Sequence, residues 1–318
     1  MLVLCIKYTI LINEYYHAGR RSDNSVLNRI TCFGKIALAG KQLSPPRAVN
    51  LGCVNKYFYK LVSDQPIIKQ WLIIKNMPGK KSIGEIYIEA CINGFLSYGM
   101  FILKENKIDI HANDELVFRW SCKNGHIQIT HWLIQLGESV KYGRININSQ
   151  DEFAFRHSCK HGHMQIAQWL IQLSESGKYG KININAQNED AFRWSCGNGH
   201  MQIAQRLIQL SESGEYKSID INAINEWAFR HSCGNGHIQI AQWLIQLSES
   251  GKYGKININA QNEDAFRWSC ANGHIQIAQW LIHLGESGEH KKSIDINAIN
   301  EWAFRWSCGN GHIQIARW

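Results

Sequence analysis

No stretch of this sequence is both long enough and apolar enough to cross a membrane. The nearest candidate is residues 1–12 (MLVLCIKYTILI), but Lys7 interrupts it and a spanning helix needs about 20 apolar residues. No small-residue cleavage site follows before residues 17–21 (HAGRR), so a signal peptide is not expected either. We therefore expect a soluble protein that has no membrane partner.

The sequence also lacks the usual signatures of catalysis. It has no glycine loop of the kind that holds phosphates, no nucleophile elbow, and no pair of carboxylates outside a repeated setting. Its histidines mostly recur with an internal repeat, which is typical of a structural role. We therefore predict a protein that is not an enzyme and has no cofactor.

Most of the chain lacks an excess of charge. Residues 1–80 contain 12 Lys and Arg against three acidic residues, whereas the rest contains 22 basic and 23 acidic residues. An electroneutral surface attracts a phosphate backbone poorly, so nucleic acid is not expected to bind residues 81–318. Binding of nucleic acid or of an acidic membrane surface by the basic segment is a separate hypothesis.

The dominant feature that is present is an internal repeat. A Ser-Cys pair recurs six times at spacings of 37, 37, 37, 37 and 38 residues, and its cysteines are Cys122, Cys159, Cys196, Cys233, Cys270 and Cys308. A weaker seventh copy surrounds Cys91. Stacked helices lie roughly 8–10 Å apart, farther than the about 7 Å between Cα atoms that a disulfide can bridge. We therefore expect reduced thiols, which are typical of the cytoplasm.

Each copy predicts a pair of short helices. In one of them, Asn188 is a good N-cap for a first helix over residues 191–196. Asn198 and Gly199 then end that helix, because glycine adopts a left-handed backbone without steric cost. A second helix over residues 201–210 carries a wide apolar stripe at helical spacing, and an extended polar link leads to the next copy.

A helix pair of this size cannot bury its own apolar face, so the copies must stack on each other. The expected fold is all-α: a helical solenoid of about seven stacked helix-turn-helix repeats over residues 85–318, preceded by a small basic helical segment over residues 1–80. The last copy reaches only residues 316–318 (ARW), inside its second helix, and has no polar capping repeat. We expect a monomer whose C-terminal end is frayed or prone to aggregate.

The copies resemble the ankyrin repeat, whose usual core reads T-P-L-H-x-A-A-x-x-G-H and is followed by an apolar helix and D-V-N-A. Here residues 190–200 read DAFRWSCGNGH and residues 220–223 read DINA. The resemblance implies an ankyrin-type fold that binds a target protein. Arg193 replaces the signature histidine, so a guanidinium contact must replace that histidine's hydrogen bond, or the bond is lost. The spelling also looks like the variant common in large DNA viruses of protists, which implies a host cytoplasm.

Partners of ankyrin-like proteins lie against the turn tips and the first helices. The resemblance therefore assigns partner contacts to Gln187, Glu189, Asp190, Asn198, Trp227, Asn235, Gln261 and Trp302. Trp227 and Trp302 are candidate exposed anchors, because tryptophan is favoured at binding hot spots. Alternatively, both pack on the adjacent repeat.

The other repeated tryptophans are interpreted as core, because a stripe at fixed repeat spacing is typical of packing. They are Trp120, Trp194, Trp268 and Trp306 on the first helices, and Trp132, Trp169, Trp243 and Trp280 on the second helices. Cys and His also lie four residues apart in every copy. Structural zinc needs four converging ligands, whereas this pattern supplies separated pairs, so no metal is expected.

The N-terminal segment resembles part of an F-box. Residues 51–71 match a helix of the type V-x-K-x-F-x-x-L-x-x-D followed by a Trp-containing turn, and residues 43–46 (LSPP) are similar to the corner between the first two F-box helices. The first of those helices is poorly matched over residues 25–42. The resemblance implies docking onto a Skp-type subunit of a cullin ubiquitin ligase through Leu43, Pro45, Val54, Phe58, Leu61 and Trp71. The chain would then be a two-part adaptor; alternatively it is a plain binding scaffold whose N-terminal segment only caps the first repeat.

Overall fold

The computed structural model describes residues 82–287 and 293–318, and every regular element in these ranges is an α-helix. The helices are α6 (Ile83–Ile92), α7 (Leu96–Glu105), α8 (Ala112–Lys123), α9 (Ile127–Gly137), α10 (Ser149–Lys160), α11 (Met164–Glu175), α12 (Ala186–Gly197), α13 (Met201–Glu212), α14 (Ala223–Gly234), α15 (Ile238–Glu249), α16 (Ala260–Ala271), α17 (Ile275–Glu286), α18 (Ala298–Gly309) and α19 (Ile313–Arg317). The predicted all-α class is confirmed for this part of the chain. None of these described helices has the length and apolar character needed to cross a membrane.

The chain divides into two compact units, Met1–Ile108 and Asp109–Trp318. The described part of the first unit is the helix pair α6–α7. A capping box starts α6: the Ser82 hydroxyl accepts from the backbone N–H of Glu85, and the Glu85 carboxylate accepts from the backbone N–H of Ser82. The domain boundary predicted between residues 80 and 85 stays a prediction.

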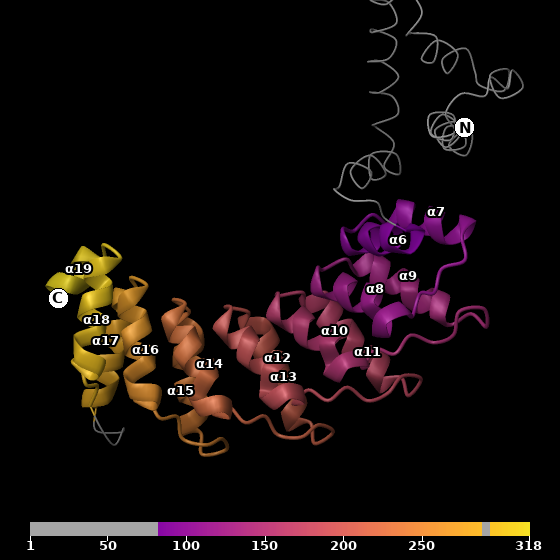
Figure 1. Cartoon of the computed structure of the whole chain (residues 1–318). Helices are drawn as coiled ribbons and strands as arrows, with labels where there is room; N and C mark the ends of the chain where they lie inside the picture. Colours follow the sequence, from indigo (N-terminus) through magenta and orange to yellow (C-terminus); the bar gives the residue numbers. More distant parts are fainter. Residues whose placement is uncertain (1–81, 288–292) are drawn as a thin grey trace, which may run out of the picture. The chain divides into compact units, whose positions relative to one another are not determined.

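In the second unit the first helices of the pairs pack on one another. The first helices of the pairs contact one another in series, from α8 through α10, α12, α14 and α16 to α18, and each also packs on the helix that follows it (Figure 1). A first helix in the middle of this series therefore has neighbours on both sides, which buries the apolar face that one pair could not bury alone.

The core lies within each pair and between neighbouring pairs. In α12 and α13, Phe192 and Cys196 are 0% exposed and Leu207 is 2% exposed. Burying a side chain the size of Phe or Leu contributes about 1.5–3 kcal/mol. The links contribute as well, because Ile182 and Ile184 are each buried before α12. Their alternation with polar residues therefore reflects packing against helices, and in the described residues it forms no strand.

A tight turn joins the two helices of each pair. After α12, Gly199 has a φ of +85°, and the backbone N–H of His200 donates to the carbonyl of Ser195 over 2.8 Å. The ring of His237, from the next pair, lies so close that a Cβ on Gly199 would come within 2.7 Å of it. Glycine is needed both for the left-handed backbone and for this close approach. The predicted end of the first helix at Asn198 and Gly199 is confirmed.

The predicted N-cap of the first helix is wrong, although the right-handed part of the helix begins at residue 190, next to the predicted residue 191. Residues 187–189 have φ values of +55°, +54° and +64°, so they form a left-handed turn, and the N-cap position of α12 is Asn185, which makes no side-chain cap hydrogen bond. Asn188 therefore does not cap the helix. Asparagine is common both at N-caps and in left-handed backbone, so the residue type could not separate the two.

Candidate partner-binding surface

Three consecutive residues with left-handed backbone precede the right-handed part of every first helix in the second unit. These left-handed turns are residues 113–115, 150–152, 187–189, 224–226, 261–263 and 299–301. Such a conformation costs roughly 1–2 kcal/mol per non-glycine residue, and it is least favourable for a β-branched residue such as Ile224 or Ile299. The first two residues of each turn are exposed. The turns therefore present a strained, solvent-facing tip in every repeat.

An arginine on each first helix stabilises the turn before it. Arg193 donates from Nε to the carbonyl of Asn188 over 2.6 Å and from Nη2 to the carbonyl of Gln187 over 3.1 Å. The same pair of bonds recurs from Arg119, Arg156, Arg230 and Arg267. The planar guanidinium suits two adjacent carbonyls, because its donors form a rigid fork. Of the two alternatives left open by the sequence, a guanidinium contact and loss of the bond, the structure shows the guanidinium contact.

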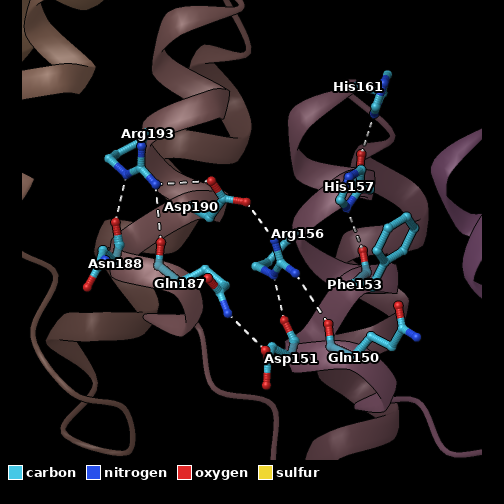
Figure 2. A network of polar contacts seen from close by, with 10 residues as sticks. All are labelled: Gln150, Asp151, Phe153, Arg156, His157, His161, Gln187, Asn188, Asp190 and Arg193. Atoms are coloured by element: carbon cyan, nitrogen blue, oxygen red, sulfur yellow. Dashed lines mark hydrogen bonds and ion pairs between the residues drawn. The ribbon is translucent and has the colours of Figure 1, made fainter. Parts of the chain in front are cut away.

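From Phe153 to Trp302, the residue after each turn alternates between an aromatic residue and aspartate along the array. Asp190 accepts from Arg156 of the preceding repeat over 2.7 Å and from Arg193 of its own repeat over 3.1 Å (Figure 2). Asp264 makes the same two kinds of contact. Each of these half-buried carboxylates therefore pairs with two guanidinium groups, one from each side of a repeat interface.

Where the aromatic residue stands, the preceding arginine stacks on it instead. The Cζ of Arg193 lies 5.3 Å from the ring centre of Trp227, which is a cation–π distance. The same contact joins Arg119 to Phe153 at 4.9 Å and Arg267 to Trp302 at 5.0 Å. Successive repeat interfaces thus alternate between an ion pair and a cation–π contact.

The Asn-Gly-His turns at Asn198, Asn235, Asn272 and Asn310 bond their repeats to the preceding one. The carbonyl of Lys160 accepts from Nδ2 of Asn198 over 2.7 Å and from Nε2 of His200 over 3.1 Å. The amide of Asn235 donates in the same way to the carbonyl of Gly197 over 2.7 Å. Burial lowers the pKa of His200, which favours the neutral ring. The side-chain amides of the predicted contact residues Asn198 and Asn235 therefore donate hydrogen bonds within the chain.

The predicted contact residues of the turn tips differ in accessibility. Gln187 and Gln261 are exposed, although Gln187 also donates to Asp151 of the preceding turn over 2.8 Å (Figure 2). Asp190 is half-buried. Glu189 is only 6% exposed, and both of its carboxylate oxygens accept from the side-chain amide of Asn185 over 2.9 Å. Its assignment to a partner is corrected: the left-handed turn directs its third residue inward, where burial raises the pKa of Glu189.

The repeated tryptophans of the first helices, unlike the phenylalanines, are half-buried or exposed rather than buried in the core. Trp268 is 45% and Trp306 is 49% exposed, so the core interpretation is wrong for these two. Trp120 and Trp194 are half-buried, as are the second-helix residues Trp132, Trp169, Trp243 and Trp280.

The two candidate anchors, Trp227 and Trp302, each lie against a tryptophan of the preceding repeat. Trp227 is half-buried, with its ring centre 4.8 Å from that of Trp194 and 3.7 Å from that of His231. Trp302 is also half-buried, with its ring centre 5.2 Å from that of Trp268. Both anchors therefore pack on the preceding repeat and keep part of their surface accessible.

Burial favours the neutral form of several cysteines and histidines. Burial raises the pKa of Cys91 and of Cys270 to about 12, and a protonated thiol is a poor nucleophile. Burial also lowers the pKa of His157 to about 4. Within residues 82–287 and 293–318, no three His, Cys, Asp or Glu side chains converge as metal ligands would.

The residues assigned to ligase docking lie outside the described part of the chain. They are Leu43, Pro45, Val54, Phe58, Leu61 and Trp71. Their assignment stays a prediction.

Neither any protein-family model nor any curated protein matches the sequence. The function is therefore inferred from the geometry of the repeats.

Proposed function

We propose that the second unit is an ankyrin-type solenoid and that the protein is an interaction scaffold that binds a target protein. The serial contact of the first helices, the recurrent Asn-Gly-His turn and the resemblance of the repeat core to ankyrin repeats support this proposal. In this proposal the chain acts as a cytoplasmic monomer without catalytic activity.

The observation that carries the proposal is the row of partly accessible aromatic rings on the first helices. This row comprises Trp194, Trp227, Trp268 and Trp302. Trp194 contacts Trp227 and Trp268 contacts Trp302, each pair across a repeat interface and beside the exposed tips of the left-handed turns. Most polar groups near them are used within the chain, so the ring faces are what this surface offers to a partner. Tryptophan is enriched among the residues that contribute most to protein–protein binding.

Affinity purification with the full chain tests this proposal. The double variant Trp194→Ala/Trp268→Ala is expected to lose the target protein that the unchanged chain retains. The matched control is Trp243→Ala/Trp280→Ala, which removes two half-buried tryptophans from the second helices. Equal loss of the target in both double variants would show that the variants act through folding, and retention in both would refute the binding surface.

We propose further that the N-terminal segment docks onto a Skp-type subunit of a cullin ubiquitin ligase, which would make the chain a substrate adaptor. The support is the resemblance of residues 43–71 to an F-box, with Val54, Phe58 and Leu61 on one face of a predicted helix. Co-purification with that subunit, and its loss on Phe58→Asp, is the expected result.

The alternative is a plain scaffold whose N-terminal segment only caps the first repeat. Recovery of a target protein without any ligase component would favour it over the adaptor. No association with the Skp-type subunit at micromolar concentration would end the ligase proposal.

A further inference from the structure

A small pocket lies between α14 and α16, on the row of aromatic rings. It has a volume of about 200 Å³, and its wall includes Arg230, Gly234, Asp264, Trp268 and Asn272. Trp268 is 45% exposed. A Cβ on Gly234 would lie 2.9 Å from the Cβ of Trp268, so the missing side chain at position 234 leaves the space beside the indole open.

The chain contains a filled version of the same site, 74 residues earlier, between α10 and α12. There Lys160 stands in place of Gly234, and its Nζ lies 3.4 Å from the ring centre of Trp194. The residues around it are the same types as around the pocket, since Arg156, His157, Asp190 and Asn198 correspond to Arg230, His231, Asp264 and Asn272. The other lining difference is His161 in place of Asn235.

The polar surroundings of the two sites also match in detail. Asp190 and Asp264 each bridge two arginines, as Figure 2 shows for Arg156, Asp190 and Arg193. The amides of Asn198 and Asn272 each donate to the carbonyl at the position of the variable residue, over 2.7 Å in both cases. An ammonium is therefore accommodated beside this arrangement of charges in the filled site.

A second lysine lies over the ring of a tryptophan elsewhere in the array. The Nζ of Lys123 lies 3.9 Å from the ring centre of Trp120. A tryptophan face attracts an ammonium through the negative charge of its π system. The rings of Trp120 and Trp194 thus each hold a lysine of this chain, whereas the wall of the pocket at Trp268 contains none.

We propose that the pocket at Gly234 and Trp268 binds the primary ammonium of a lysine side chain from the partner protein, which takes the place that Lys160 occupies against Trp194. This inference rests on the proposed scaffold function and adds a chemical requirement for its partner. A lysine at the contact contributes an apolar stem that covers the indole and a charge that lies over it.

The test uses the full chain labelled with 5-fluorotryptophan and followed by fluorine NMR. Trp→Phe variants assign the resonances of Trp194 and Trp268 among the 12 tryptophans. The probe is Nα-acetyl-lysine N-methylamide, and its control is Nα-acetyl-norleucine N-methylamide, which has the same stem without the ammonium. The lysine probe is expected to shift the Trp268 resonance, and the norleucine probe to bind at least about fivefold more weakly. An equal response to both probes, or none at Trp268, would overturn the proposal.

Two reciprocal variants sharpen the test. Lys160→Gly is expected to open the equivalent site, so that the Trp194 resonance now responds to the lysine probe. Gly234→Lys is expected to abolish the response of Trp268, although its Cβ requires a small shift of the helices. Lys160→Gly only removes atoms, and an unresponsive Trp194 in the folded variant would contradict the proposal. Because no target protein takes part, these results are independent of whether the scaffold function itself holds.

Discussion

At Gly199 a single position meets two demands, since its φ is +85° and the ring of His237 lies where a Cβ would be. Gly214 shares the left-handed backbone, with a φ of +81°, but has nothing within 4 Å of its Cβ position. The pair therefore separates the cost of the backbone conformation from the cost of the contact between repeats.

We expect Gly214→Ala to lower the free energy of unfolding by about 1 kcal/mol, which is the usual cost of a left-handed non-glycine residue. Gly199→Ala should cost more, at least about 2 kcal/mol, because the new methyl group also displaces the histidine of the next repeat. Urea unfolding followed by circular dichroism measures both values. Equal losses would mean that the histidine moves aside freely.

His157 should make the fold sensitive to acid. Burial lowers its pKa in the folded chain to about 4, whereas a histidine in an unfolded chain titrates near ~6.5. Between these values the unfolded chain binds more protons, so this contribution to stability is complete above pH ~6.5 and is lost as the pH falls towards 4. His157→Trp, the residue at the equivalent position 194, is expected to reduce the loss of unfolding free energy between pH 7 and pH 5. An identical loss in both proteins would rule out His157 as a source of that sensitivity.

At the scale of the helices, Asp190 connects α10 with α12 through Arg156 and Arg193. Its side chain is 15% exposed and that of Arg156 is 12% exposed, so removal of the carboxylate leaves two poorly solvated guanidinium groups without a counter-ion. We expect Asp190→Ala to cost about 2–4 kcal/mol of unfolding free energy. Asp190→Trp should cost less, because Arg156 can then stack on the ring as Arg193 does on Trp227. Thermal and urea unfolding compare the two variants, and an equal cost would show that the aromatic contact does not substitute for the ion pair.

The helix pairs could be predicted from the sequence because their signals are repeated and local. A 37-residue period, an apolar stripe and a glycine at each turn specify where helices lie and where the first helix of a pair ends. The left-handed turn before that helix could not be predicted, since an asparagine such as Asn188 is common both at an N-cap and in left-handed backbone. The choice depends on Arg193, five residues away, whose guanidinium bonds the turn carbonyls.

The surface was harder to predict than the fold. Periodicity shows that Trp268 and Glu189 recur, but not which side of the helix faces a neighbouring repeat. The ring of Trp268 is therefore more exposed than expected and the carboxylate of Glu189 less so. The alternation of Asp190 and Asp264 with Trp227 and Trp302 was visible in the sequence. Its connection to the arginine of the preceding repeat emerged only from the packed structure.

At the scale of the whole second unit, equivalent residues differ in burial according to their place in the array. Phe229 is 0% exposed, whereas Phe304, at the same position of the repeat in α18, is 54% exposed. Phe229→Ala is expected to cost about 3–5 kcal/mol of unfolding free energy, and Phe304→Ala less than about 1 kcal/mol.

Hydrogen exchange offers an independent measure of this difference in burial along the array. The amides of residues 304–318 should exchange faster than those of residues 229–243, because fewer buried contacts hold them. Equal protection of both segments in a monomeric sample would contradict this expectation.

The alternation between ion pair and cation–π contact bears on how such a gene changes length. Loss of only the repeat that contains Asp190 would bring Arg156 against Trp227, replace its ion pair by a cation–π contact and interrupt the alternation. Loss or gain of two neighbouring repeats together preserves the alternation of ion pairs and cation–π contacts at the repeat interfaces. Insertions and deletions of an even number of repeats are therefore expected to be less destabilising than those of an odd number, with the double repeat as the favoured unit of recombination.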